Sequence, residues 1–243
     1  MIDLHTVLSQ KRAVIFDLDG TLINSIGMWN AVDAALIGEL TGQPVTEDVQ
    51  TQRDETLARF RTRHDPYMAY CGFLRDKYAP ALTEKQVHAR RYAIAQDMLE
   101  NAVDYKPGAA ELLRRLKAAG HILVLATTTR RHSIEVYDTR NVRIMEKGGV
   151  TAYFDRVYTS EDVENSKPDP EVYHRLFADF GLMPEQCIVF EDSLIGLQAA
   201  KAAGVDAVAV YDPYSDPDRA AINALADWTV QNFTELLKEE FSC

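Results

Sequence analysis

The 243-residue sequence predicts an α/β fold, a Rossmann-like parallel sheet core with helices on both faces, and an inserted all-helical cap domain. The sheet is predicted by short apolar runs of strand length that alternate with helical patterns, because strands buried on both faces are apolar at every position. The cap is predicted by a stretch of roughly 80 residues after the first run, which has helical patterns only and is too long for a loop.

Four buried strands are expected, at residues 13–16, 122–126, 187–190 and 205–210. Between them lie two segments with apolar residues at i, i+3, i+4 and i+7, which predict amphipathic helices at 109–116 and 173–180. Gly120 ends the first of these helices and Gly181 ends the second. Strands and helices in alternation are typical of a parallel sheet covered by helices.

The expected cap begins with a helix whose apolar face carries Val32, Leu36 and Leu40. Thr46 begins a capping-box pattern that leads into a second helix, and Thr83 precedes a long polar helix. We expect the cap to comprise residues 23–105, between the two parts of an α/β core at 1–22 and 106–243. The linkers near 22–25 and 103–107 are expected to be hinges.

Composition limits the classes of partner. The formal net charge is −11, and no local basic patch offsets it, so we expect no nucleic acid or membrane partner. Cys71, Cys187 and Cys243 have no metal-ligand or disulfide spacing and are expected to be free thiols. With no apolar run of signal-peptide or membrane-span length, the sequence predicts a soluble, cytoplasmic protein, as a monomer or small homo-oligomer.

The first expected strand ends in the most informative motif, Asp17-Leu18-Asp19-Gly20-Thr21. Aspartates at i and i+2 point to the same side of the chain, and Gly20 permits a sharp turn. Ligands of open parallel sheets bind beyond the carboxyl ends of the strands, which is where this motif lies. An ordinary polar turn is the alternative interpretation, since Asp and Gly are common turn residues.

Polar residues follow the other strands too. Thr127, Thr128 and Thr129 come after the second strand, and Glu191-Asp192 ends a later one. Lys167 precedes a helix that begins at a proline. Each has an alternative interpretation, as a helix cap, a solvent-exposed acid pair or a solvated charge. We nevertheless expect all of them at one crevice, because they all lie where the carboxyl ends of the strands meet.

The order of these motifs resembles that of the haloacid dehalogenase (HAD) superfamily, in its beta-phosphoglucomutase-like phosphatase branch with a helical cap. The resemblance implies that Asp17 attacks phosphorus to form a phosphoaspartate, and that Asp19 acts as general acid and then general base. It implies phosphate binding by Thr127, Thr128 and Lys167. It also implies a Mg²⁺ ion held by Asp17, the backbone carbonyl of Asp19 and Asp192, with Glu191 completing the set.

The same resemblance indicates which activities of the superfamily fit this sequence. Haloacid dehalogenases lack an acid at the position of Asp19, so its presence indicates phosphate esters. Trp29 stands where beta-phosphoglucomutases carry a histidine, which disfavours sugar-phosphate isomerisation. Arg53 stands where those mutases carry an arginine that binds a second phosphate, although it could also be a surface helix residue. Trp29 could likewise be cap core rather than a substrate contact.

We therefore predict a Mg²⁺-dependent phosphatase acting on a small phosphomonoester, such as a sugar phosphate. A phosphomutase is the alternative, and a non-catalytic binding module is a weaker one. The segment 138–150 is expected to be a surface excursion or an extra flap near the site.

Overall fold

The computed structural model describes residues 3–46, 48–60, 62–63 and 65–238. The chain divides into two compact units, a core of Met1–Ser25 with Val103–Cys243 and a cap of Ile26–Ala102. The boundaries lie three residues from the expected ones at either end of the cap. The two connecting segments pair with each other in antiparallel fashion, through Asn24 N–H to the Asp104 carbonyl (3.0 Å) and Lys106 N–H to the Leu22 carbonyl (2.8 Å). This pairing explains why both segments belong to the core unit.

The core contains a six-stranded sheet in the order β3-β2-β1-β4-β5-β6, in which every pairing is parallel. Its strands are β1 (Ala13–Phe16), β2 (Ile122–Ala126), β3 (Arg156–Tyr158), β4 (Cys187–Glu191), β5 (Asp206–Val210) and β6 (Trp228–Val230). The four predicted strands are confirmed. Sequence reasoning missed β3 and β6, since each has only three residues and no extended apolar run.

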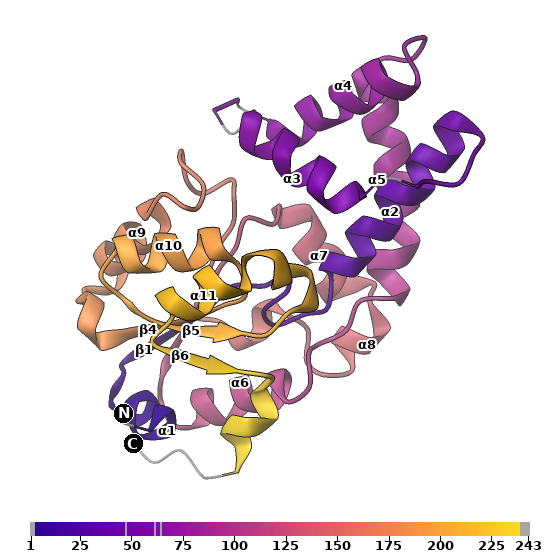
Figure 1. The fold of residues 1–243 in the computed structure, drawn as a ribbon. Helices are drawn as coiled ribbons and strands as arrows, with labels where there is room; N and C mark the ends of the chain where they lie inside the picture. The colour runs from indigo at the N-terminus through magenta and orange to yellow at the C-terminus, as the bar shows by residue number, and fades with distance from the viewer. Residues whose placement is uncertain (1–2, 47, 61, 64, 239–243) are drawn as a thin grey trace. The chain divides into compact units, whose positions relative to one another are not determined.

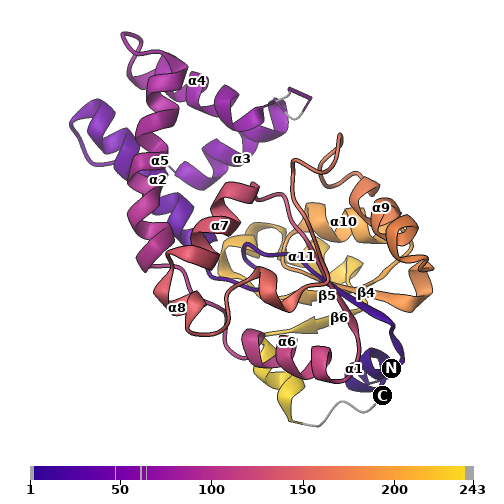
Figure 2. The same cartoon turned by 180° about the vertical axis from the view of Figure 1, so that it is seen from behind.

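Helices cover both faces of the sheet, as Figures 1 and 2 show for the core. The helices of the core are α1 (Leu4–Gln10), α6 (Ala109–Ala118), α7 (Arg131–Thr139), α8 (Val142–Met145), α9 (Glu171–Phe180), α10 (Leu194–Ala202) and α11 (Arg219–Leu225). Short 3₁₀ helices are η1 (Thr151–Tyr153), η2 (Pro184–Gln186), η3 (Pro213–Asp218) and η4 (Phe233–Leu237). The doubly covered α/β sheet is the predicted fold class.

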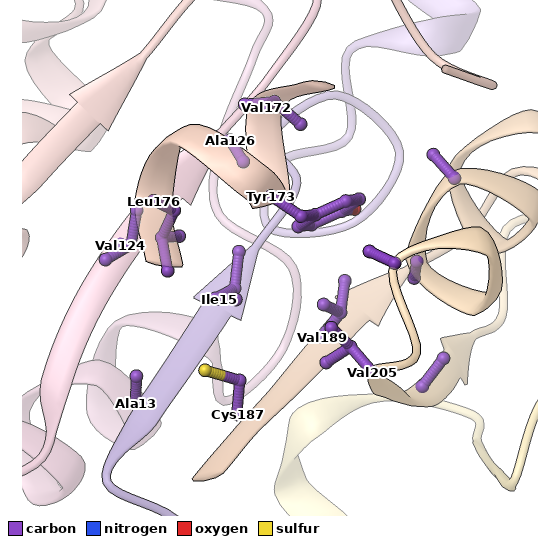
Figure 3. Close-up of a cluster of buried hydrophobic side chains, with 14 of the residues drawn as sticks. Ala13, Ile15, Val124, Ala126, Val172, Tyr173, Leu176, Cys187, Val189 and Val205 are labelled. Atoms are coloured by element: carbon purple, nitrogen blue, oxygen red, sulfur yellow. The ribbon is translucent and has the colours of Figure 1, made fainter. Parts of the chain in front are cut away.

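Successive residues of β1 point to opposite faces. Ile15 packs with Tyr173 and Leu176 of α9 in one buried cluster (Figure 3). Phe16 faces the other way, where its ring stacks on that of Phe190 at 4.9 Å between centroids. Both faces are therefore apolar, which makes β1 a fully buried strand that directs the residues following it to the sheet's carboxyl edge.

The cap unit consists of α2 (Ile26–Thr41), α3 (Val49–Arg59), α4 (Pro66–Tyr78) and α5 (Glu84–Asn101). No strand occurs among the described residues of this unit, as expected. Thr83 forms the predicted cap of α5, with Gln86 completing the capping box. The predicted second helix is confirmed as α3, but its predicted cap was wrong. Its N-cap is Asp48, whose carboxylate accepts from the N–H groups of Gln50 and Thr51, and not Thr46.

The segment 138–150 packs against the second connecting segment of the core. The Tyr105 hydroxyl donates to the Gly149 carbonyl at 2.7 Å, and the Asn141 side-chain amide donates to the Val103 carbonyl at 2.9 Å. Part of it forms the short helix α8. These contacts attach the segment to residues 103–105.

Cys71 and Cys187 are buried free thiols, and Cys243 lies outside the described residues. Among the residues that the structure describes, no helix combines the length and apolar character needed to cross a membrane.

Candidate active site

The motif after β1 forms a tight turn at the carboxyl edge of the sheet. Asp17 continues the strand, since its N–H donates to the carbonyl of Phe190 at 3.0 Å. Gly20 has φ +80°, and a Cβ there would lie 2.4 Å from Asp192 Oδ2. The glycine thus serves two purposes, because it adopts a left-handed conformation and lets the turn approach Asp192.

Lys167 is the cation of the site. Its Nζ lies 2.8 Å from Asp17 Oδ1, 2.5 Å from Glu191 Oε1 and 2.8 Å from the Ala126 carbonyl, and its side chain is only 4% exposed. These three acceptors match the three donors of an ammonium group. Lys167 therefore bridges the ends of β1, β2 and β4.

Asp17, Glu191 and Asp192 form a buried acidic cluster, with oxygens that all lie within 4.8 Å of one another. Burial raises the pKa of Asp17 well above its ordinary value, and Lys167 opposes that rise. Burial also raises the pKa of Asp192 to about 7, with the charge of Glu191 adding to the effect. One buried ammonium does not balance three carboxylates, so the residues fit a hard divalent cation with oxygen ligands.

The two carboxylate oxygens of Glu191 accept hydrogen bonds from different residues. While its Oε1 accepts from Lys167, its Oε2 accepts from the Ser193 hydroxyl at 3.0 Å. A Cβ on Gly196 would lie 1.9 Å from Glu191 Oε1, so only glycine at that position leaves room for this carboxylate. Glu191 therefore positions Lys167, a role that the predicted metal set does not include.

Asp19 lies beside the cluster and is held by two hydroxyls, those of Ser25 and Thr129, which donate to its two oxygens. Burial raises the pKa of Asp19, and both hydrogen bonds oppose that rise. A carboxyl group with a raised pKa can carry a proton closer to neutral pH, as a general acid must. Sequence reasoning missed Ser25, and it assigned no role to Thr129.

The predicted phosphate-binding residues Thr127, Thr128 and Lys167 line one small pocket beside this cluster. Thr127 is buried, and its hydroxyl accepts from the Thr129 N–H at 3.1 Å, whereas Thr128 is exposed. The remaining lining residues are Thr159, Ser160, Val163, Asn165, Ser166 and Val172. The structure thus brings the residues predicted from three strand ends, together with Lys167, to one edge of the core.

Trp29 and Arg53 belong to the cap unit and have partners within it. Arg53 donates to Asp33 Oδ2 at 2.8 Å and to Asn30 Oδ1 at 2.9 Å. It is buried, so the alternative of a surface helix residue is wrong. Trp29 is half-buried, and the guanidinium carbon of Arg91 lies 4.6 Å from its ring centroid.

Comparison with known families identifies the class. The sequence profile of the family described as haloacid dehalogenase-like hydrolase matches residues 14–210, which is most of the chain. The protein belongs to this family, in agreement with the resemblance of its motifs.

Two relatives and one solved structure indicate the kind of hydrolase within this family. The chain is 29% identical over 198 residues to a phosphorylated carbohydrates phosphatase of Thermotoga maritima, covering 81% of this chain and 83% of that protein. It is 27% identical to hexitol phosphatase B of Escherichia coli K12, covering 95% and 96%. The crystal structure of CbbY from Rhodobacter sphaeroides in complex with phosphate superposes with a TM-score of 0.70 at 26% identity, covering 93% and 96%. The protein is accordingly an HAD-like phosphoric monoester hydrolase.

Proposed function

We propose that this protein is a Mg²⁺-dependent phosphatase that hydrolyses a small phosphomonoester, a sugar phosphate or similar metabolite, through a phosphoaspartate. The observation that carries the proposal is the ion pair of Asp17 with Lys167 inside the buried acidic cluster. A carboxylate can act as a covalent nucleophile toward phosphorus, but it needs positive charge around it when it approaches an anionic ester. The names of the relatives support the substrate class.

In the first step an oxygen of Asp17 forms a bond to phosphorus while the bond from phosphorus to the ester oxygen breaks. Asp19 gives its proton to that leaving oxygen, which departs as an alcohol. In the second step Asp19 takes a proton from water, whose oxygen attacks phosphorus and releases Asp17 and inorganic phosphate. Thr127, Thr128 and Lys167 are proposed to bind the phosphoryl oxygens, and the raised pKa of Asp19 suits its alternating role.

The acidic cluster fits the proposed metal. Asp17, Asp192 and the backbone carbonyl of Asp19 would hold Mg²⁺, and Glu191 would complete the set while it also holds Lys167. Bound there, the ion would supply positive charge to the phosphoryl oxygens. A cation would also stabilise the ionised forms of Asp17 and Asp192, which burial disfavours.

Arg53 bears on the choice between phosphatase and phosphomutase. Beta-phosphoglucomutases carry an arginine at this position that binds a second phosphate, whereas Arg53 hydrogen-bonds to Asp33 and Asn30 within the cap. The phosphatase is favoured by Trp29, which stands where those mutases carry a histidine. Trp29 stays a predicted substrate contact, because its ring offers an apolar surface to a leaving group.

The wider expectations form part of the same proposal. The absence of nucleic-acid and membrane partners is supported by the net charge of −11. A cytoplasmic location stays a prediction. A monomer or small homo-oligomer stays a prediction.

The experiment is release of inorganic phosphate from a panel of sugar phosphates, hexitol phosphates and other phosphomonoesters, in Mg²⁺ and in EDTA. Asp17→Asn should lower release by on the order of 10⁴-fold or more, because it removes the nucleophile. Asp76→Asn in α4, whose side chain is 68% exposed, is the matched control and should behave as wild type. Release that persists in EDTA or in Asp17→Asn would contradict the mechanism. Interconversion of beta-glucose 1-phosphate without release from any ester would favour the mutase.

A further inference from the structure

We infer that Ser215 is a positioning residue for the metal-binding carboxylate of Asp192, and that a buried ion pair between Lys106 and Asp212 holds Ser215 in place. The inference rests on the proposed function, in which Asp192 binds Mg²⁺. It concerns residues outside the four sequence motifs, which sequence reasoning did not connect with the site.

Two hydroxyls hold Asp192, one on each oxygen. Thr21 Oγ1 donates to Asp192 Oδ1 at 2.8 Å, and Ser215 Oγ donates to Asp192 Oδ2 at 3.2 Å. The carboxylate is only 3% exposed, so the two hydroxyls fix its plane within the protein. Each oxygen keeps a second lone pair, so that hydrogen bonding and cation binding are compatible.

Ser215 occupies a fixed place in the turn η3. This turn begins at Asp212, whose Oδ1 accepts from the Tyr214 N–H at 3.0 Å and whose carbonyl accepts from the Ser215 N–H at 3.1 Å. Pro213 and Pro217 restrict φ within the same turn. The position of the Ser215 hydroxyl therefore depends on where Asp212 is held.

Lys106 holds Asp212. Its Nζ lies 2.8 Å from Asp212 Oδ2 and 2.9 Å from the Tyr211 carbonyl, and the two charged side chains are 9% and 5% exposed. The backbone N–H of Lys106 also donates to the Leu22 carbonyl at 2.8 Å, one residue beyond Thr21. Lys106 thus connects to both hydroxyls that hold Asp192, through its backbone to the Thr21 turn and through its side chain to the Ser215 turn.

These contacts around Asp192 have a physical consequence for the metal site. Residues that orient metal ligands commonly change metal affinity by about 10- to 100-fold when they are mutated. Ser215 orients a ligand directly, whereas Lys106 and Asp212 orient Ser215. Loss of Lys106 alone would in addition leave the Asp212 carboxylate buried without its cation, which is costly.

The test measures Mg²⁺ binding by the whole protein without substrate, by isothermal titration calorimetry. We expect Ser215→Ala to weaken Mg²⁺ binding about tenfold, while kcat at saturating Mg²⁺ and Tm change little. Ser215→Thr, which keeps a hydroxyl, should recover most of the affinity. Ser9→Ala is the matched control, because its hydroxyl donates to the Thr6 carbonyl in α1, away from the sheet's carboxyl edge.

Lys106→Met tests the second half of the inference and should weaken Mg²⁺ binding as Ser215→Ala does. Because it also leaves a buried charge and could lower stability, the double variant Lys106→Met/Asp212→Asn should restore Tm without restoring affinity. Mg²⁺ affinity of Ser215→Ala within twofold of wild type would overturn the inference. Asp192→Asn separates the two proposals, since unchanged Mg²⁺ binding in that variant would mean that the proposed metal site itself is wrong.

Discussion

Each unit of the chain buries a charge cluster, and the two clusters have opposite excess charge. In the core, three carboxylates share one ammonium group; these residues are Asp17, Glu191, Asp192 and Lys167. In the cap, two guanidinium groups share one carboxylate; these residues are Arg53, Arg91 and Asp33. The comparison shows when a buried charge indicates a site and when it indicates a structural contact.

The charged groups of the cap cluster have their partners within the cap unit. Asp33 accepts from Arg91 Nε at 2.6 Å through one oxygen and from Arg53 Nη1 at 2.8 Å through the other. The excess positive charge lies against aromatic rings, since the Arg91 guanidinium carbon is 4.6 Å from the Trp29 ring centroid and 5.6 Å from that of Tyr70. Cation–π contacts of this kind stabilise a desolvated guanidinium. The cluster needs no ligand to complete it.

The core cluster differs because its three carboxylates share the single ammonium group of Lys167 among the residues that the structure describes. Burial raises the pKa of both Asp17 and Asp192 in spite of Lys167. Such raised values mean that the partners of the two ionised carboxylates do not make up for the water lost on burial. An incomplete set of this kind at a sheet's carboxyl edge indicates a binding site, whereas a completed set indicates a structural role.

The largest expected effect is on catalysis and should come from Asp19→Asn, which removes a carboxyl group beside the core cluster and leaves both clusters intact. Phosphate release should fall about 10²- to 10⁴-fold, because the general acid is lost, while Tm stays close to that of wild type. In a pre-steady-state assay the first step should lose less with 4-nitrophenyl phosphate, whose leaving group needs no proton. An equal loss for that ester and for alkyl phosphates would contradict the assignment of Asp19 as the acid.

Asp33→Asn should affect stability rather than metal binding. Removing the anion from two buried guanidinium groups should cost about 3–5 kcal/mol in the free energy of unfolding, measured with urea. Mg²⁺ affinity by calorimetry should not change. Asp54→Asn is the matched control: Asp54 also lies near Arg53, at 3.6 Å, but its side chain is 57% exposed, and its loss should cost about 0–1 kcal/mol. Equal costs for the two variants would remove the distinction between buried and exposed pairs.

The smallest effect concerns pH in the absence of metal. The pKa of Asp192 is about 7 in the folded protein against an ordinary value of 3.8, so the folded state binds more protons between these values. Stability therefore falls as pH rises from about 3.8 to about 7. We expect the Tm of wild type, measured against that of Asp192→Asn in EDTA, to fall over this range, and Mg²⁺ to reduce the fall. A Tm difference that is constant with pH would show that Asp192 does not titrate there.

Local patterns explain how much of the fold and the site could be predicted. Strand β1 and the turn at Asp17 are contiguous, so apolar run and motif are both visible in the sequence. β3 and β6 were missed, because they are short and their strand character depends on neighbours across the sheet. The N-cap of α3 was misplaced from Asp48 to Thr46, since two candidate caps lie close together and only the backbone conformation selects one.

The sequence by itself determined the kind of chemistry, because Asp17, Asp19, Lys167 and Asp192 each follow or precede a recognisable element. Only the tertiary structure decided the partners that give these residues their properties. Ser215 reaches Asp192, Thr129 reaches Asp19 and Arg53 pairs with Asp33. Hydrogen bonds between residues far apart in the chain leave no periodicity or spacing in the sequence, since they arise only when packing brings separate elements together.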